Sequence, residues 1–503
     1  MLNEPLTRVL GAVALVLSYY VWQRKRLPLP PGPSPRLFIG NLHQIPTNHP
    51  WLTYAEWSKK YGPIFTLRIF SQTHIVLNSS KAVLDLLEAR SAIYSDRPVS
   101  WMLSNLAGRT VFQLSFLDSH FPKYRKMLHS GLNKRATKAY RPIQNHQLKI
   151  LLQGLVESPN EFPASIKRYV AGIALKIAYG YDVSSDNDYF VGLAEQNARA
   201  AASVLQPFFW VETFPFLRFI PSWFPFATFK RTMFEAKKVI DVVEAVPFEW
   251  AKEKIASGNY TDSFFSQYFR PDEDSPLDDE DWRNLKWTSA SIYSGGAHTT
   301  AAAMTTFFLL MSQNPEIQKT AQAEIDKATG RERLLNGDDQ ASLPYVTALL
   351  KETLRFAPVA PLGLMHRVIK DDIYEGYFIP KGATVIANIW AITHDSESYP
   401  DPFTFDPTRH LGDKPQPDPF QFVFGYGRRV CPGAALGEES LFLAVANILA
   451  SFNISKAVDA EGNEIEPAFE WFSSVVTYPT NFGCRISPRF PETLTALTQT
   501  EEI

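Results

Sequence analysis

One cysteine near the carboxyl terminus has the surroundings in this chain that best suit chemistry. Within the stretch 424–433, Cys431 lies between Gly427 and Gly433, directly ahead of an apolar run, Ala434 to Ala450, that predicts a helix. Free N–H groups where a helix begins favour a thiolate, and the glycines allow a flat group to approach the backbone. These features suit an axial thiolate ligand of haem iron. A buried free cysteine in a glycine-rich turn is the competing interpretation.

The complete ten-residue pattern favours the haem interpretation. Phe424 can shield the sulfur, and Arg429 can meet an anion. The pattern resembles the haem-ligand loop of the cytochrome P-450 monooxygenases, Phe-x-x-Gly-x-Arg-x-Cys-x-Gly. Its fixed positions are occupied by Phe424, Gly427, Arg429, Cys431 and Gly433. The resemblance implies haem b (iron protoporphyrin IX) as cofactor, Cys431 as the metal ligand and O2 as co-substrate.

A second stretch with adjacent glycines lies in the middle of the longest expected helix, Trp282 to Gln313. Gly295 and Gly296 lower helix stability, so their presence there predicts close approach of a flat or small group, with a tight helix crossing as the alternative. The stretch 294–300 resembles the family's oxygen-activating motif, Ala/Gly-Gly-x-Asp/Glu-Thr-Thr/Ser. The resemblance assigns the catalytic hydroxyl to Thr299.

His298 occupies the position where that motif has an acid. In the family the acid passes protons inward from solvent. Histidine can relay protons near neutral pH, although burial lowers its pKa and favours the neutral form. We therefore hypothesise a proton relay through His298, with a bystander histidine and water acting through Thr299 as the alternative.

Several charged residues match positions that support the haem in the family. Glu352 and Arg355 are three residues apart and so share a helix face. With Arg409 they resemble the family's buried Glu-x-x-Arg and Arg network, which holds the cysteine loop in shape. The resemblance assigns the haem propionates to four cations: Arg97, Arg125, Arg367 and Arg429.

One departure weakens the match at Arg125. The family usually has Trp-Arg-x-x-Arg there, whereas this chain has Phe121 in place of the tryptophan. The change removes the indole N–H, which would be one propionate donor.

A basic cluster follows Phe121 and suggests a docking surface. Its members are Lys123, Lys126, Lys134, Arg135 and Lys138. A solvated basic face is the alternative to docking of an acidic electron-transfer partner. The run Gly425 to Val430 fails Gly-x-Gly-x-x-Gly at its last place, so we expect no nicotinamide site. The resemblance implies electrons from a membrane-bound NADPH-cytochrome P-450 reductase, with cytochrome b5 as a second candidate donor.

Composition narrows the protein class. A net charge of −2 and a pI near 6.6 give no support for nucleic-acid binding, and 36 phenylalanines and 11 tryptophans can build a core and an apolar pocket. With only two cysteines, Cys431 and Cys484, a disulfide framework is not expected. We interpret Cys484 as a packing residue.

The amino terminus predicts a membrane anchor. An apolar segment, Leu6 to Trp22, is interrupted by Arg8 and followed by basic residues 24–26. A cleaved signal peptide is the competing interpretation. The proline-rich run 28–33 predicts a stiff link, as in microsomal family members. The predicted units are an anchor (1–26), a hinge (27–35) and a haem-thiolate catalytic domain (36–503), with the domain on the cytosolic side of the endoplasmic reticulum membrane.

Pattern also predicts several further elements. The acidic run Asp272 to Asp281 predicts a solvated loop, and Asn314 to Gly330 predicts a helix. The uncharged segment Ile292 to Met311 is long enough for a membrane span, but its small and polar centre favours a helix that lines a pocket. The predicted strands are a hairpin of Ile64–Phe70 with His74–Asn78, and a strand pair within Tyr377–Ile389 around Pro380–Gly382.

The resemblance covers almost the whole chain and implies the mainly α cytochrome P-450 fold with small β-sheets. Segments 376–382 and 388–390 look most like fungal secondary-metabolism members. The implied reaction inserts one atom of O2 into a C–H or C=C bond of an apolar terpenoid, polyketide or indole-like compound. We expect the protein to be a monomer. The alternatives are a haem-thiolate isomerase, lyase or dehydratase that needs no O2, and a non-catalytic haem sensor.

Family position also predicts the substrate pocket, whose walls should be largely apolar or aromatic. The predicted segments are Trp101–Phe116, Phe208–Trp210, Ile292–Gly296, Val359–Leu362 and Val475–Val476.

Overall fold

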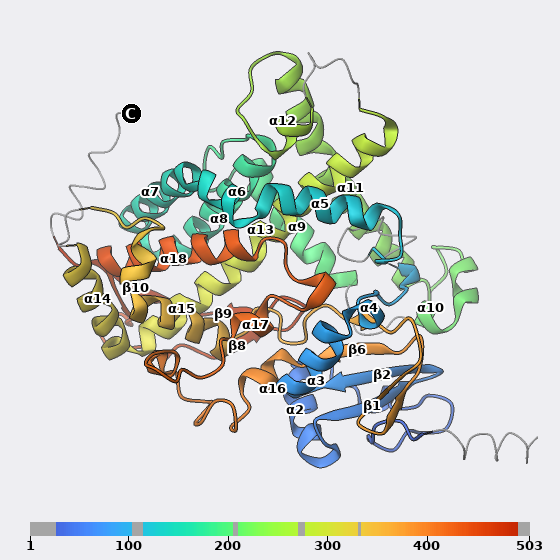
Figure 1. Ribbon diagram of the computed structural model, residues 1–503. Helices are drawn as coiled ribbons and strands as arrows, with labels where there is room; N and C mark the ends of the chain where they lie inside the picture. Colours follow the sequence, from blue (N-terminus) through green and yellow to red (C-terminus); the bar gives the residue numbers. More distant parts are fainter. Residues whose placement is uncertain (1–26, 103–113, 205–209, 270–276, 330–332, 491–503) are drawn as a thin grey trace, which may run out of the picture.

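Helices dominate the computed structural model, and the sheet that contains β1 (Ile64–Ile69), β2 (Gln72–Leu77) and β6 (Thr384–Ala387) lies at one end of the molecule, at the lower right of Figure 1. The structure describes residues 27–102, 114–204, 210–269, 277–329 and 333–490. The predicted mainly α class with small sheets is confirmed. The predicted anchor, residues 1–26, lies outside the described residues.

The longer helices form most of the body. They are α2 (Pro50–Tyr61), α5 (His120–Leu132), α7 (Arg141–Glu157), α8 (Phe162–Tyr179), α9 (Tyr189–Val204), α11 (Thr228–Ala256), α13 (Asp279–Gln313), α14 (Pro315–Thr329), α15 (Pro344–Phe356) and α18 (Ala434–Ser451). The short α-helices are α3 (Ser80–Val83), α4 (Ser91–Tyr94), α6 (Lys134–Ala139), α10 (Trp210–Thr213), α12 (Phe264–Tyr268), α16 (Ile389–Thr393) and α17 (Phe420–Val423). Single turns of 3-10 helix are η1 (Leu42–Gln44), η5 (Pro159–Glu161), η6 (Pro215–Phe219), η7 (Asp339–Ser342), η8 (Pro407–His410) and η9 (Gly427–Arg429), and η2 (Leu84–Ala89) is π-helical.

Helix α13 crosses the middle of the molecule and packs against α5, α8, α9, α11 and α18 (Figure 1). It begins earlier than predicted. The Asp278 side chain caps its first turn by accepting a hydrogen bond from the N–H of Asp281, and residues 279–281 supply negative charge at the positive end of the helix dipole. The last residues of the acidic run are therefore helical, and the prediction of a loop through Asp281 is wrong there.

Two other helix predictions are confirmed. Helix α14 covers the predicted segment from Pro315 to Thr329, while Gly330 lies outside the described residues. Helix α18 follows the cysteine stretch as predicted and ends one residue later, at Ser451. Among the described helices, α18 is the one apolar and long enough to cross a membrane by composition, but 67% of it is buried inside the protein.

The largest sheet has the strand order β1-β2-β6-β3. Its strands are β1 (Ile64–Ile69), β2 (Gln72–Leu77), β6 (Thr384–Ala387) and β3 (His366–Arg367). The hairpin of β1 and β2 is confirmed, with Ile64 opposite Leu77. The turn is shorter than predicted, because Phe70 adopts a positive φ of 52° and β2 starts at Gln72.

The predicted strand pair within Tyr377–Ile389 is wrong in its pairing. Strand β5 (Tyr377–Ile379) pairs with β4 (Asp372–Tyr374), whereas β6 joins β2 in parallel and β3 antiparallel. Ile389 begins helix α16. The remaining pairs are β7 (Phe452–Lys456) with β10 (Cys484–Pro488), and β8 (Glu470–Phe472) with β9 (Tyr478–Thr480). Cys484 is buried in β10, as a packing residue would be.

The proline-rich run lies against the folded body. The carbonyl of Pro31 accepts a hydrogen bond from the Thr66 N–H at 2.7 Å, and that of Pro28 accepts one from Phe378 at 2.8 Å. A Cβ on Gly32 would lie 2.0 Å from the Thr66 carbonyl oxygen, so only glycine permits this contact. The run therefore docks on β1 and β5.

Candidate active site

A cavity of about 540 Å³ lies between α13 and the stretch around Cys431. The amino-terminal end of α18 and segments 359–364 and 472–476 close other sides, and α8, α9 and α11 complete the wall. The wall is mainly apolar. Polar and charged side chains from several elements also reach it.

The stretch that carries Cys431 has a fixed backbone shape. The Cys431 N–H donates to the Phe424 carbonyl at 2.7 Å, which closes the turn through η9. Gly427 has a φ of +52°, and a Cβ there would lie 2.5 Å from both the Leu87 carbonyl oxygen and the Cβ of Ser91. Glycine at this position therefore lets the turn pack directly on η2 and α4.

The sulfur of Cys431 borders the cavity, so the side chain is accessible although protein surrounds it. Burial raises the pKa of the thiol, while the N–H of Gly433 and the charge of Arg125 act in the opposite direction. Burial has the larger effect, so the predicted helix-start stabilisation of a thiolate is insufficient by itself. A positive charge beside the sulfur, such as a metal cation, would favour the thiolate.

Helix α13 contributes Gly295, Gly296, His298 and Thr299 to the cavity wall. The Thr299 hydroxyl donates to the Gly295 carbonyl at 2.9 Å, which keeps it on the cavity side of the helix. A Cβ on Gly296 would lie 3.3 Å from that of Ala174 on α8, so the tight helix crossing accounts for this glycine. The structure thus brings the predicted oxygen-side residues to the same cavity as Cys431.

The His298 ring lies at the cavity edge, perpendicular to the ring of Tyr478 with centroids 5.7 Å apart. Burial and the positive charge of Lys167 lower the pKa of His298, while Glu195 opposes the shift. The imidazole is therefore predominantly neutral at pH 7. This agrees with the effect of burial expected from the sequence.

Three of the four predicted cations reach the cavity: Arg97, Arg125 and Arg429. Arg97 is buried and donates to the carbonyls of Leu364 and Met365, each at 2.7 Å. Burial, together with repulsion from Arg429, lowers the pKa of Arg97 to about 9. Arg125 donates to the Val430 carbonyl at 3.0 Å and lies beside the Cys431 turn.

Arg429 is held by the carbonyls of Ser95 and Leu114, at 2.7 and 2.6 Å. Its guanidinium lies 4.3 Å from the ring centroid of Phe121, the residue that replaces the usual tryptophan. Phe121 therefore supplies an aromatic face for Arg429, although it cannot donate a hydrogen bond. Burial lowers the pKa of Arg429 to about 10.

The fourth predicted cation is placed elsewhere. Arg367 forms an ion pair with Asp96 and is not among the described residues that line the cavity. The prediction that Arg367 faces the cofactor site is therefore not supported by its position. Its neighbour His366 lines the cavity instead, with Nδ1 bonded to the Tyr94 carbonyl at 2.7 Å and a pKa lowered to about 3 by burial.

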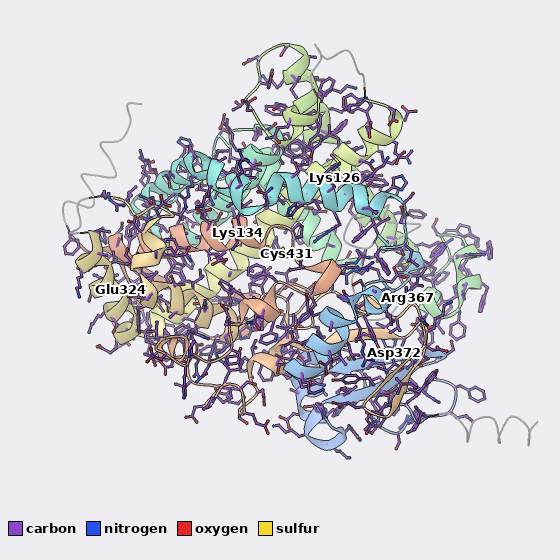
Figure 2. The ribbon with its side chains drawn as sticks, in the orientation of Figure 1. Lys126, Lys134, Glu324, Arg367, Asp372 and Cys431 are labelled. Atoms are coloured by element: carbon purple, nitrogen blue, oxygen red, sulfur yellow. The ribbon has the colours of Figure 1, made fainter. Side chains whose placement is uncertain are left out.

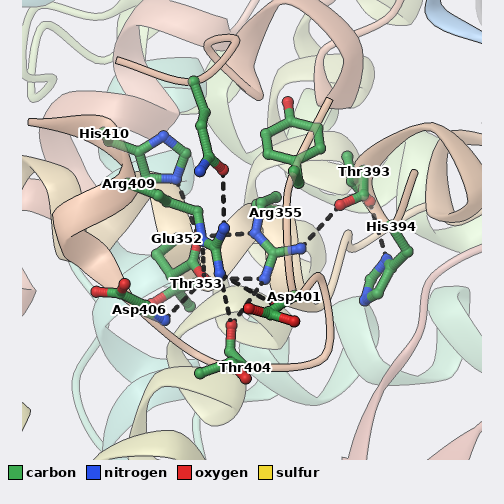
Figure 3. A network of polar contacts seen from close by, with 12 residues as sticks. Glu352, Thr353, Arg355, Thr393, His394, Asp401, Thr404, Asp406, Arg409 and His410 are labelled. Atoms are coloured by element: carbon green, nitrogen blue, oxygen red, sulfur yellow. Dashed lines mark hydrogen bonds and ion pairs between the residues drawn. The ribbon is translucent and has the colours of Figure 1, made fainter. Parts of the chain in front are cut away.

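Glu352 is the centre of a buried charge network (Figure 3). Its carboxylate accepts two hydrogen bonds from Arg355, at 2.7 and 2.9 Å, and one from Arg409 at 3.0 Å. His410 Nε2 lies 2.9 Å from the carboxylate, and the Asp406 N–H donates to it at 2.9 Å. Sequence reasoning missed His410, because a histidine beside an arginine has no distinctive spacing.

The network also fixes the chain that precedes the cysteine stretch. Arg409 donates to the side chain of Gln416 at 2.8 Å, and the Gln416 N–H donates to the Arg409 carbonyl. The two arginines also donate to the carbonyls of Thr393, Pro400, Asp401 and Thr404. Among the described residues, no hydrogen bond joins the network directly to 424–433. Its hydrogen bonds outside α15 go to residues within 393–416.

The predicted pocket segments are partly placed at the cavity. Residues from 292–296, 359–362 and 475–476 line it. Residues 103–113 and 205–209 lie outside the described residues, and Trp101 and Trp210 do not contribute to the described wall. Trp210 is instead exposed and stacks on Phe214. Sequence reasoning missed the contribution of α9 and α11, because helical periodicity alone does not show which helices close over a cavity.

The predicted basic cluster lies on α5 and α6. Lys123 pairs with Glu280 at 2.7 Å, while the side chains of Lys126 and Lys134 are exposed. Figure 2 shows Lys126, Lys134 and Cys431 in the same region of the molecule. Because Arg125 of α5 bonds to Val430, this basic surface is joined to the cysteine stretch by direct contact.

Comparison with known proteins agrees with this geometry. The family model described as Cytochrome P450 matches residues 30–483. The chain belongs to the cytochrome P450 family. It is 37% identical to cytochrome P450 monooxygenase claR of Ampulloclitocybe clavipes over 95% of this chain and 90% of that protein. It is also 37% identical to cytochrome P450 monooxygenase 208 of Postia placenta (98% and 97% covered) and to cytochrome P450 monooxygenase COX2 of Coprinopsis cinerea (94% and 91%).

Membership of the cytochrome P450 family confirms the recognition made from the sequence and the oxidoreductase class that incorporates molecular oxygen. The family uses haem iron with a cysteine thiolate ligand, together with small-molecule substrates and a redox partner. The cavity suits a haem group. It combines an accessible thiol, apolar walls and three guanidiniums, whose mutual repulsion an anionic cofactor would relieve.

Proposed function

We propose that this protein is a membrane-anchored monooxygenase that hydroxylates or epoxidises an apolar fungal secondary metabolite, using NADPH electrons supplied by a reductase. The observation that carries the proposal is that the Cys431 sulfur lies at the wall of a mainly apolar cavity, which Gly295 and Thr299 also line. The similarity to fungal monooxygenases supports the reaction class. A terpenoid, polyketide or indole-like substrate suits the apolar wall.

The proposed cofactor is haem b. Cys431 would ligate the iron, and Arg97, Arg125 and Arg429 would hold the propionates by charge-assisted hydrogen bonds. Haem supplies the redox chemistry that activates O2 when it is bound. Phe424 would cover the sulfur side, and Gly433 would leave room beside it.

The residues of α13 have proposed roles on the oxygen side. Thr299 would hold a proton at its hydroxyl and pass it into the cavity, and Gly295 would leave space for O2. His298 would accept protons at its imidazole from the solvent side, because its neutral form has a free ring nitrogen at pH 7. Glu352, Arg355 and Arg409 would preserve the shape of the chain that leads to Cys431.

The proposed electron donor is a membrane-bound NADPH-cytochrome P450 reductase, with cytochrome b5 as a second donor. The basic residues of α5 and α6 support docking of an acidic partner on the side of Cys431. The proposed organisation is an anchor over 1–26, a proline-rich segment over 27–35 and a catalytic domain over 36–503. We propose that it is a monomer whose domain faces the cytosol from the endoplasmic reticulum.

The proposal is tested by producing the full chain with a fungal reductase. The reduced protein with carbon monoxide should show the absorption band of a thiolate-ligated haem, and Cys431→Ser should lose that band. Cys484→Ser is the matched control and should keep it, because Cys484 is buried in β10 away from the cavity. Product analysis with pools of terpenoids, polyketides and indoles should then show NADPH-dependent gain of one oxygen atom.

A second candidate function is isomerisation, lyase chemistry or dehydration on the same haem-thiolate site. The observation that favours it is His298, a neutral base where the family motif has an acid. Conversion of a substrate in the absence of NADPH and O2 would support this function. Strict dependence of product on both would exclude it.

A further inference from the structure

Glu244 on α11 is an acidic side chain in a mainly apolar cavity wall. Among the described residues that line the cavity it is the only aspartate or glutamate. Its neighbours in the wall include Ile240 and Val243 on the same helix and Ala198 on α9. A carboxyl group in such surroundings is costly unless something binds it.

The described part of the chain offers Glu244 no hydrogen bond and no ion pair. Lys286 and Lys237 act on it only through their charges, and Asp241 opposes them. Lys237 is itself paired with Asp241 at 2.8 Å, and Lys286 lies over the ring of Phe248. Burial therefore dominates and raises the pKa of Glu244 to about 7.

Two further polar groups lie in the same region. Asn197 brings an amide to the cavity wall from α9, the helix that packs against α11. Tyr179 of α8 is 3% exposed, and its hydroxyl has no hydrogen-bond partner among the described residues. The pKa of Tyr179 is raised by burial, by Tyr293 and by the charge of Glu244, which places Tyr179 within electrostatic reach of that carboxyl.

We propose that Glu244 is a specificity-determining residue that accepts a hydrogen bond from a donor group on an otherwise apolar substrate. The donor is a hydroxyl or a protonated amine, and either would satisfy the carboxyl, to which the described residues offer no partner. This inference rests on the proposed function, since it assumes that the cavity beside Cys431 holds the substrate. It narrows the substrate class from apolar compounds to apolar alcohols and amines.

Binding of three probes of nearly equal shape tests the inference in the haem-loaded full chain. The probes are adamantane, 1-adamantanol and 1-(dimethylamino)adamantane, whose hindered tertiary amine disfavours ligation of iron. Equilibrium dialysis measures affinity without turnover. The affinity ratio of 1-adamantanol to adamantane should be about 2- to 10-fold higher in the wild type than in Glu244→Leu, or the ratio of the protonated amine to adamantane about 10- to 100-fold higher.

The pH dependence of probe binding distinguishes the two donors, the hydroxyl and the protonated amine. A preference for the amine should fall between pH 8 and pH 5.5, because Glu244 becomes neutral over that range. A preference for the alcohol should persist at both pH values, because a neutral carboxyl still accepts a hydrogen bond. Glu244→Leu should abolish either preference and leave adamantane binding unchanged or tighter.

Two further variants serve as an isosteric replacement and as a control. Glu244→Gln keeps the shape and should retain part of an alcohol preference while losing an amine preference. Glu249→Gln, an exposed change on the same helix, should behave as the wild type. Unchanged affinity ratios of both donors to adamantane in Glu244→Leu would overturn the inference. Loss of the thiolate-haem spectrum from the wild type would instead count against the proposed function.

Discussion

Replacement of Glu352 by glutamine is the most informative test of the buried network. The change keeps the side-chain shape but removes the charge that faces Arg355 and Arg409. Glu352 and Arg355 are fully buried and Arg409 is 8% exposed, so solvent cannot replace the lost partner. Removing one member of a buried ion pair costs about 3–5 kcal/mol. We expect the free energy of unfolding to fall by that amount.

Urea unfolding followed by tryptophan fluorescence measures this change, and haem content per chain gives a second readout. Glu316→Gln is the matched control. Glu316 also pairs with a cation three residues away, Lys319, but the side chains are 82% and 68% exposed. That change should cost less than about 1 kcal/mol. Similar midpoints for the two variants, with equal haem content, would refute the reasoning.

The same network predicts a dependence on pH. Burial alone would raise the pKa of Glu352, but hydrogen bonds from His410 and Arg355 lower it below the usual value. A carboxyl with a lowered pKa stabilises the folded state above its unfolded pKa, about 4.3, and loses that effect as the pH falls through the folded value. The advantage of the wild type over Glu352→Gln should therefore be constant from pH 5 to 7 and shrink below about pH 4.

Three further predictions concern the cavity and the docking surface. Gly427→Ala should lower the free energy of unfolding in urea by at least about 1–3 kcal/mol and reduce haem content, because a Cβ at φ +52° would lie 2.5 Å from the Leu87 carbonyl oxygen. The control is Gly192→Ala on a helix with open space around it, which should raise the free energy of unfolding by about 0.5–1 kcal/mol. Equal effects of the two changes would contradict the argument. His298→Asp should change the ratio of product to NADPH consumed and the pH profile, and no change in either would end the relay hypothesis. Lys126→Glu should raise the KM for the reductase, and the increase should be largest at low salt. Lys60→Glu on α2 should leave that KM unchanged. Equal effects of the two changes would argue against docking on α5.

Local patterns predicted much of the secondary structure. The apolar run after Cys431 became α18, the Asn314-Pro315 start became α14, and two segments rich in β-favouring residues became the hairpin of β1 and β2. These elements depend on caps, periodicity and turn residues that lie close together in the chain. The prediction of a solvated loop was wrong for the last residues of the acidic run. Negative charge is typical of solvated loops, but it also stabilises the first turn of a helix.

Pairing and placement needed the tertiary structure. The two strands within 377–389 were recognisable, but β6 pairs with β2 and β3, which are remote in sequence. Arg367 and His366 are adjacent, yet strand geometry turns one toward Asp96 and leaves the other in the cavity wall. Alternation along a strand is visible in a sequence, whereas the face that meets a cavity is not.

The sequence by itself determined which reactive groups are present, because a thiol at 431, glycines beside it and a hydroxyl at 299 are matters of residue type and local spacing. The tertiary structure decided which groups surround that chemistry. It showed that burial opposes the Cys431 thiolate, that His410 joins Glu352, and that Glu244 enters the cavity from α11. Those outcomes depend on desolvation and on contacts between distant segments, which only the folded chain creates.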